Sequence, residues 1–221
     1  MLQRILELTA LKVATLAVAA AGFASVLPAY AGAQAEEALS ASVQASLQAA
    51  ISDRAAPKSV FLSGFDEQMW IIEMSGRLAK KVPDPITRTE FLRTVHYEAS
   101  RAGLDPQVVL GLIQVESNFR KYAVSSVGAR GFMQVMPFWK KMIGSADQNL
   151  FHLRTNLRFG CTILRHYLDI ERGDYYRALG RYNGSLGKPE YPNLVLSSWH
   201  GSFRYERTKL AALEAATRTS H

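Results

Sequence analysis

Glu116 is the side chain whose place in the sequence points most directly to chemistry. It lies in a helix predicted for residues 105–117, in the middle of an apolar arc formed by Val109, Leu112 and Ile113. An ionised carboxylate is costly to bury among apolar side chains. Glu116 is therefore expected either to pair with a cation or to hold a proton near neutral pH because its pKa is raised. A carboxyl group that keeps its proton meets the requirement for a general acid.

The helix alone does not establish a catalytic role for this glutamate. A buried ion pair with an arginine would explain the same position, and so would a carboxylate that opens to solvent at the helix end. Taken without its neighbours, the helix favours that structural interpretation. The residues that follow the helix instead favour a catalytic role for Glu116.

Four short blocks of sequence follow one another in a fixed order and spacing. They are Glu116-Ser117, Ser125-x-x-Gly128-Ala129-x-Gly131-x-Met133-Gln134-x-Met136-Pro137, Asn156-x-x-x-Gly160 and Tyr182-Asn183. Together they closely resemble the soluble lytic transglycosylase family, whose domain has a lysozyme-like fold. The resemblance covers roughly Leu104 to Gly187, with weaker likeness back to about Phe65. The resemblance implies a mainly α, lysozyme-like (α+β superfamily) single domain with a substrate cleft.

The resemblance also implies site residues and a reaction. Glu116 matches the family's catalytic acid, and further positions match residues that bind the saccharide or orient the glutamate. These substrate-binding candidates are Ser117, Ser125, Gln134, Met136, Tyr182 and Asn183. The reaction is cleavage of the β-1,4 bond between N-acetylmuramic acid and N-acetylglucosamine in peptidoglycan, with a 1,6-anhydromuramic end as product. Glu116 would act first as acid and then as base.

The chemistry of the candidate residues agrees in kind with these roles. Gly128 and Gly131 allow positive φ or a close approach of backbone to a ligand. Gln134 offers both a donor and an acceptor to a sugar, and Tyr182 is expected to donate its hydroxyl to the carboxylate or an intermediate. For Met136, ordinary core packing explains the residue as well as sugar contact does.

Three other functions remain open at this point. A hydrolytic muramidase, or lysozyme, would use the same glutamate with water as the nucleophile. A wall-binding scaffold would keep the cleft without turnover, although Glu116, Gln134 and Tyr182 speak against it. A nucleic-acid binder rests only on charge: 26 Lys and Arg against 19 Asp and Glu give +7, without a long basic run. Peptidoglycan stems carry carboxylates too, so peptidoglycan is the expected partner and nucleic acid is not.

The family pattern is broken at one visible point. An Asp-Pro pair often precedes the Asn156 block in the family, but this chain has His152-Leu153. Because this stretch precedes a helix, an altered helix start is expected rather than lost chemistry.

No His-x-x-x-His pattern or carboxylate cluster suggests a metal, and no cofactor is expected. Protein partners and oligomeric state are not indicated.

The remaining pattern predicts a helical chain. Apolar spacing and capping signals predict helices over 65–82, 87–102, 105–117, 155–171, 175–182 and 191–205. In the first of these, Phe65, Met69, Ile72 and Leu78 have helical spacing. No alternating strand of any length is visible, so a mainly helical domain is expected over 60–205, with its motif core at 104–187.

The N-terminal residues are typical of a secretory signal peptide. Basic residues precede an apolar run over 13–27, and an Ala-x-Ala exit suggests cleavage after Ala31, with Ala33 or Ala35 as the next choices. An uncleaved anchor is the alternative, but the run is shorter than the roughly 20 residues of a spanning helix. We expect a signal peptide at 1–31, an Ala/Ser/Gln-rich mobile lead at 32–59 and a tail at 206–221. The mature protein is then expected in the periplasm or elsewhere outside the cytoplasm, without a stable membrane anchor.

Overall fold

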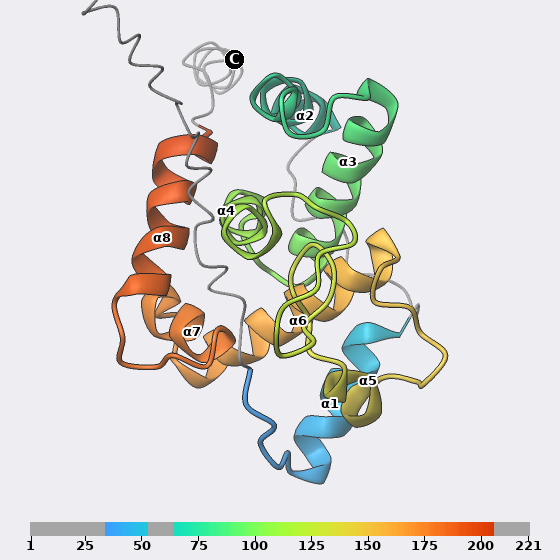
Figure 1. Cartoon of the computed structure of the whole chain (residues 1–221), viewed down its shortest axis with the longest axis vertical. Helices are drawn as coiled ribbons and strands as arrows, with labels where there is room; N and C mark the ends of the chain where they lie inside the picture. Colours follow the sequence, from blue (N-terminus) through green and yellow to red (C-terminus); the bar gives the residue numbers. More distant parts are fainter. Residues whose placement is uncertain (1–33, 53–63, 206–221) are drawn as a thin grey trace, which may run out of the picture.

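A computed structural model of the chain describes residues 34–52 and 64–205; the predicted signal peptide and C-terminal tail lie outside them. The described residues are helical, with isolated bridges between Val124, Arg130 and Val135 in place of a strand. The mainly α prediction is confirmed. The elements are α1 (Ala41–Ile51), α2 (Gly64–Leu78), α3 (Pro85–Arg101), α4 (Pro106–Ser117), α5 (Phe138–Ile143), α6 (Leu153–Ile170), α7 (Tyr175–Tyr182), α8 (Glu190–Ser198) and the π-helical turn η1 (Trp199–Phe203) (Figure 1).

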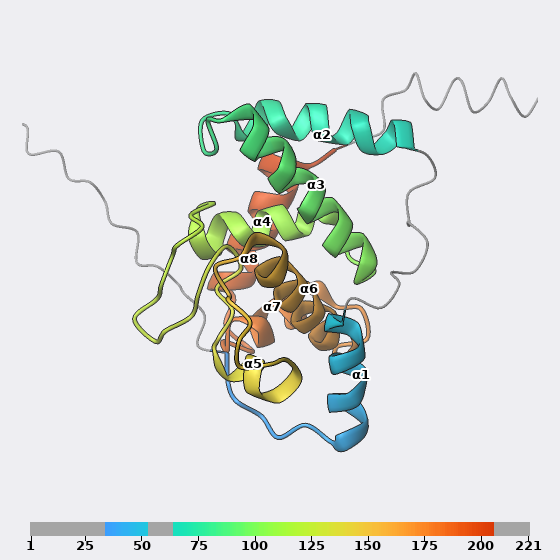
Figure 2. The ribbon, with the colours of Figure 1, turned by 90° about the vertical axis from the view of Figure 1, so that its right-hand side faces the viewer.

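Helix α4 lies in the middle of the molecule. Figure 2 shows α2 and α3 above it and α1 and α5 at the opposite end. Asp105 caps its N-terminus by accepting a hydrogen bond from the Gln107 N–H at 2.7 Å, and Pro106 occupies the first turn. The helix stops at Asn118, whose φ of 49° is left-handed. Its predicted start and end are therefore confirmed.

Helices α4 and α8 approach each other closely because Gly111 has no side chain. A Cβ at this position would lie 3.0 Å from the Trp199 nitrogen and 3.0 Å from the Val195 oxygen. Any larger residue would push the two helices apart. The close approach matters for function, because α4 carries Glu116 near its C-terminal end and α8 carries the residue that contacts it.

Helix α2 buries Leu78, as predicted, but not Met69 and Ile72 of the same predicted face. Met69 and Ile72 are 36% and 65% exposed, whereas Trp70 and Met74 are buried. Apolar residues occur on both sides of this helix, so spacing alone does not select the face. Packing against α3 selects it: the Trp70 ring lies 5.2 Å from the His96 ring, centroid to centroid.

The predicted helix over 191–205 is also divided differently. The α-helical part ends at Ser198, and the backbone continues as the π-helical turn η1. Phe203, in this turn, is buried and packs its ring edge-on against Phe119, with centroids 6.0 Å apart. The wider turn thus places an aromatic side chain beside the residues that follow Glu116.

Residues 34–52 belong to the segment expected to be a mobile lead. The structure corrects this expectation for them, because they pack on the domain. Leu47 and Ile51 of α1 are each 7% exposed and belong to the core, and α1 packs against α5 and α6. The Gln44 side chain donates to the Met142 oxygen at 2.7 Å. Apolar residues are few in this segment, but Leu39, Val43, Leu47 and Ile51 recur every four residues and form one stripe.

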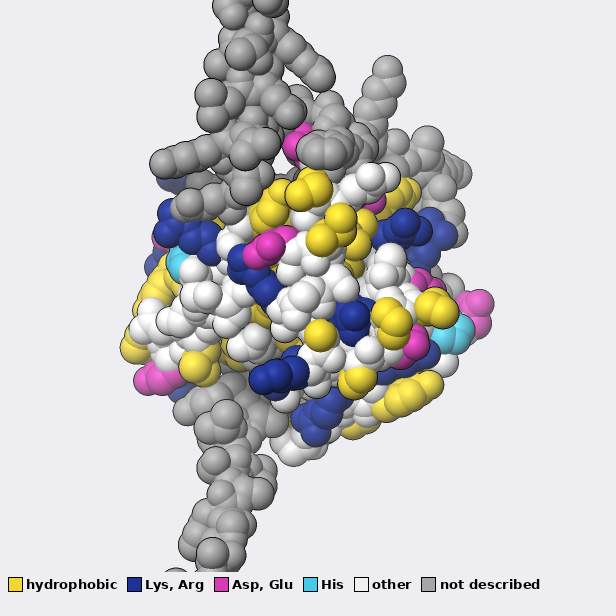
Figure 3. Space-filling view, turned by 90° about the horizontal axis from the view of Figure 1, so that it is seen from above, with side chains coloured by type: hydrophobic (Ala, Val, Ile, Leu, Met, Phe, Trp, Pro, Cys, Tyr) yellow, Lys and Arg dark blue, Asp and Glu magenta, His cyan; other side chains and the backbone are white. Residues whose placement is uncertain are grey.

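The surface gives no sign of a nucleic-acid stripe on the face drawn in Figure 3. Lys and Arg side chains are scattered there among apolar and uncharged ones.

Within the described residues, no helix combines the length and apolar character needed to span a membrane.

Candidate active site

Glu116 is buried on the inner side of α4, as its place on the apolar arc predicts. Only 4% of the residue is exposed, which rules out a carboxylate that opens to bulk water at the helix end. The Tyr191 hydroxyl donates a hydrogen bond of 2.5 Å to its Oε1 atom. A neutral phenol therefore donates to this oxygen of the carboxyl group.

Tyr191, at the start of α8, is a site residue that the sequence did not reveal. It is 1% exposed, and burial raises the pKa of its phenol well above 10.0, with the neighbouring Glu116 adding to the effect. The hydroxyl therefore keeps its proton and remains a donor at any physiological pH. Tyr191 lies beyond the last motif block; the only sequence signal was that a buried tyrosine needs a hydrogen-bond partner.

Tyr182 has a different partner from the expected one. Its hydroxyl donates to the Met133 oxygen at 2.7 Å and not to the Glu116 carboxyl group. The side chain is completely buried, and burial, followed by the charge of Glu116, raises its pKa well above 10.0. The charge of Glu116 thus affects the pKa of Tyr182, but the Tyr182 hydroxyl makes its hydrogen bond to the loop that contains Met133.

That loop, residues 123–136, is held in shape by two of the predicted site residues. The Ser125 hydroxyl accepts from the Ala129 N–H at 3.0 Å. The Gln134 side chain donates to the Ala123 oxygen at 3.1 Å and to the Gly131 oxygen at 2.9 Å, from a backbone with a φ of 48°. The Ser125 hydroxyl and the Gln134 amide nitrogen therefore build the loop.

Asn156 ties the same loop to α6. Its Oδ1 accepts from the Met133 N–H, and its Nδ2 donates to the Arg130 and Leu150 oxygens, each at 2.8 Å. The helix starts at Leu153, and His152 at its N-cap provides no side-chain hydrogen bond. The loop attachment is intact, so the missing Asp-Pro pair does not disturb it.

The other predicted residues are less directly engaged. The Ser117 hydroxyl is buried and donates back along α4 to the Ile113 oxygen at 3.2 Å. Asn183 donates to the Ser185 hydroxyl at 3.0 Å, and its Oδ1 is buried. Met136 is half-buried at the end of the loop. The structure thus brings Glu116, Tyr182 and Tyr191 together and joins the loop to them through Met133.

Across the described ranges, His, Cys, Asp and Glu side chains form no cluster of three or more that would hold a metal ion.

Gly131→Ala is expected to destabilise the protein more than Gly128→Ala. Both glycines have positive φ, at 76° and 88°, which costs an alanine about 1–2 kcal/mol. At Gly131 a Cβ would also lie 2.4 Å from the Asn156 Nδ2 and 2.6 Å from the Leu150 oxygen, whereas at Gly128 nothing lies within 4 Å. Denaturant unfolding should give a loss of roughly 2–4 kcal/mol for Gly131→Ala. Equal losses for both variants would contradict the described attachment of the loop.

Comparison with known proteins finds a domain model that matches part of this chain. Residues 93–190 match the model of the transglycosylase SLT domain, and they contain Glu116, the loop, Asn156 and Tyr182. Over this range the chain is similar to the transglycosylase SLT domain. Tyr191 lies one residue beyond the matched range.

The relatives that this chain matches are longer proteins. The transglycosylase of Enterobacteria phage PRD1 is 32% identical over 102 residues, which are 46% of this chain and 37% of that protein. The membrane-bound lytic murein transglycosylase C of Haemophilus ducreyi is 32% identical over 117 residues, 44% of this chain and 31% of the relative. The matched part of the chain therefore spans about a third of the length of these two relatives.

Among solved structures, an inactive mutant of the lytic transglycosylase Slt from Pseudomonas aeruginosa is similar to the described fold. The sequence identity is 23% and the TM-score 0.41, over 61% of this chain and 25% of that one.

Proposed function

We propose that this protein is a lytic transglycosylase that cleaves the glycan strands of peptidoglycan. The observation that carries the proposal is the Glu116 carboxyl group, 4% exposed and held by the Tyr191 phenol at 2.5 Å, within the range that is similar to the transglycosylase SLT domain. The names of the relatives, transglycosylase and lytic murein transglycosylase, support the same activity.

The proposed reaction uses one carboxyl group twice. Protonated Glu116 gives its proton to the oxygen between N-acetylmuramic acid and N-acetylglucosamine, and the bond from that oxygen to C1 breaks. The C6 hydroxyl oxygen of the muramic residue bonds to C1, and its proton passes to Glu116. The acid is regenerated, and the product is a 1,6-anhydromuramic end formed without water. Most glycosidases need a second carboxylate to supply or activate a nucleophile, but here the substrate supplies it.

The surrounding residues serve this step by position. Tyr191 keeps its proton and fixes the carboxyl group from one side, which limits the rotation of Glu116. Tyr182 and Asn156 fix Met133 from two other elements, and so set the loop with Gln134 and Met136 at its end. Ser117, Ser125 and Asn183 complete the proposed substrate-binding set in supporting positions. Such pre-organisation is how enzymes hold a reacting group close to its productive geometry.

The direct test of turnover is the clearing of purified peptidoglycan sacculi by the purified protein. Turbidity is expected to fall while soluble muropeptides are released. A catalytically silent wall-binding scaffold would co-sediment with the sacculi and release nothing, and that result would refute the proposed function.

Tyr191→Phe should reduce the rate without unfolding the protein. The variant keeps the ring that packs in the core but removes the donor to Glu116, so the carboxyl group gains rotational freedom. We expect kcat to fall by about 10- to 100-fold, the range for a misplaced reacting group. Initial rates of muropeptide release measure this loss. Tyr176→Phe is the matched control, because that ring is 38% exposed on α7 and should have no effect.

The proposed site of action is outside the cytoplasm, on the peptidoglycan itself. This follows from the signal-peptide pattern over 1–31 and agrees with the relatives named membrane-bound murein transglycosylases. Fractionation of cells should find the mature chain in the periplasm, and retention of the full-length chain in the cytoplasm would contradict the proposal.

A further inference from the structure

The residues before the matched range reach the proposed site through Gln34. Residues 34–52 lie outside the matched range 93–190, yet Gln34 is only 4% exposed. Its Oε1 accepts two hydrogen bonds, from the Trp139 Nε1 at 2.9 Å and from the Met136 N–H at 3.3 Å. One side-chain oxygen of this segment therefore holds the end of the loop 123–136 and the start of α5.

The same amide also contacts the site from a second direction. Burial raises the pKa of Tyr182, and a contact from the Gln34 side chain opposes this effect. Gln34 is therefore a neighbour of Met136, Trp139 and Tyr182. All three belong to the matched range, and two of them are proposed site residues.

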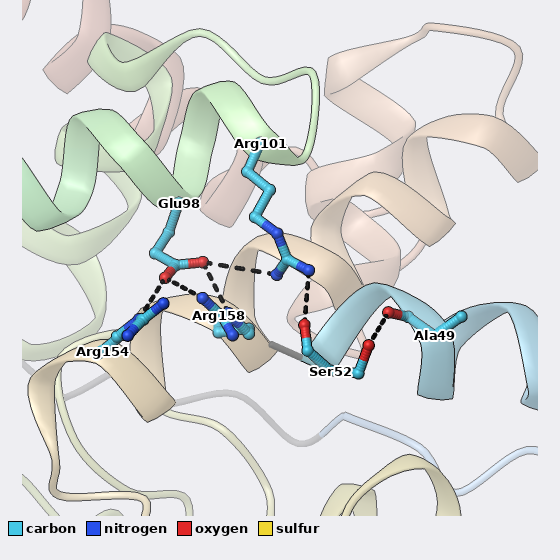
Figure 4. Close-up of polar contacts among 6 residues, drawn as sticks. All are labelled: Ala49, Ser52, Glu98, Arg101, Arg154 and Arg158. Carbon is cyan, nitrogen blue, oxygen red and sulfur yellow. Dashed lines mark hydrogen bonds and ion pairs between the residues drawn. The ribbon is translucent and has the colours of Figure 1, made fainter. Parts of the chain in front are cut away.

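The segment that carries Gln34 is held by polar anchors as well as by packing. Gln44 donates to the Met142 oxygen at 2.7 Å. At the other end of α1, Arg101 of α3 donates to the Ser52 oxygen at 2.7 Å, and its other terminal nitrogen lies 3.9 Å from Glu98 (Figure 4). A guanidinium at this place also suits the negative end of the helix dipole.

These anchors matter because α1 packs incompletely on the domain. A cavity of about 480 Å³ lies between α1, α3 and α6, with Leu47 on one wall and Arg158 and Thr162 on another. Apolar contact alone therefore does not fix α1 in place. Hydrogen bonds at Gln34, Gln44 and Ser52 add to the packing of Leu47 and Ile51 in holding the segment.

We propose that Gln34 is a positioning residue of the enzyme, acting through the loop 123–136 and the start of α5. Through its two acceptor bonds Gln34 sets the position of Met136 and of the loop that carries Gln134. This inference rests on the proposed function, since the loop is taken to bind the glycan. A chain without this contact would keep Glu116 but hold the glycan poorly.

The test compares Gln34→Leu with Gln44→Leu, in the active protein and in the Glu116→Gln background. Gln34→Leu should lower kcat/KM for sacculus digestion by about 10-fold, chiefly through KM, because a small displacement of a binding group has effects of this size. In the inactive background it should weaken co-sedimentation with sacculi. Gln44→Leu should stay within about two-fold, because Leu47, Ile51 and the Arg101 contact still hold α1.

Folding is controlled by measuring Tm and assaying well below it. If Gln34→Leu does not fold, Trp139→Phe removes one of the two donors, leaves Gln34 in place and should change KM in the same direction by a smaller factor. An active parent with unchanged KM and binding in the folded Gln34→Leu variant would overturn the inference. A parent that neither digests sacculi nor binds them in the Glu116→Gln form would instead refute the proposed function.

Discussion

Glu116→Gln is expected to lower the rate of peptidoglycan cleavage by about 10³-fold or more while binding of the glycan persists. General acid–base catalysis contributes about 10²- to 10⁴-fold, and the same group is proposed to act in both proton transfers. The amide has nearly the shape of the carboxyl group, and its oxygen can still accept the hydrogen bond from Tyr191. The fold and the binding surface should therefore remain.

The measurement is the initial rate of muropeptide release, together with co-sedimentation of the protein with sacculi. Glu90→Gln is the matched control, because Glu90 is an exposed glutamate of α3 and should not change the rate. Equal clearing by Glu116→Gln and the parent protein would remove Glu116 from its proposed role. Loss of binding together with rate would show that the substitution damages more than proton transfer.

Glu98→Gln is expected to cause the largest loss of stability. The Glu98 side chain is 1% exposed and accepts from Arg158 at 2.7 Å and 2.9 Å, while Arg154 and Arg101 lie 3.4 Å and 3.9 Å away (Figure 4). Three guanidinium groups thus share one buried carboxylate. Removing its charge leaves Arg158, itself 7% exposed, buried without the carboxylate that it faces. Breaking such a pair typically costs about 3–5 kcal/mol.

Denaturant unfolding should show this loss as a lower midpoint, and Tm should fall by about 10 °C. Glu73→Gln is the control: Glu73 and Arg77 form a pair at 2.6 Å, but their side chains are 49% and 31% exposed, so the change should stay below about 1 kcal/mol. Similar losses for the two variants would mean that Glu98 is not buried with its partners.

The sequence predicts the parts of this protein that depend on local pattern. Helix α4 could be placed between Asp105 and Ser117 because an N-cap, a proline and an apolar arc all act over a few residues. The burial of Glu116 follows from the same arc. The loop 123–136 could be identified because its glycines and Gln134 have fixed spacing in the family pattern.

The contacts that the sequence does not predict depend on which helices and loops pack together in the fold. Tyr191 contacts Glu116 only because Gly111 lets α8 approach α4, and no local pattern reports that contact. Tyr182 and Tyr191 are both buried tyrosines, and their hydrogen-bond partners cannot be told apart without the fold. The role of Gln34 cannot be predicted from the sequence, because nothing in an Ala- and Ser-rich segment indicates that Gln34 accepts a hydrogen bond from Trp139.

The central claim, that one carboxyl group cleaves the strand without water, is tested most directly by digesting sacculi in water labelled with heavy oxygen. Mass spectrometry of the released muropeptides should show 1,6-anhydromuramic ends that carry no label and are lighter by one water than hydrolysed ends. Reducing muramic ends that carry the label would contradict the account and identify the protein as a hydrolytic muramidase.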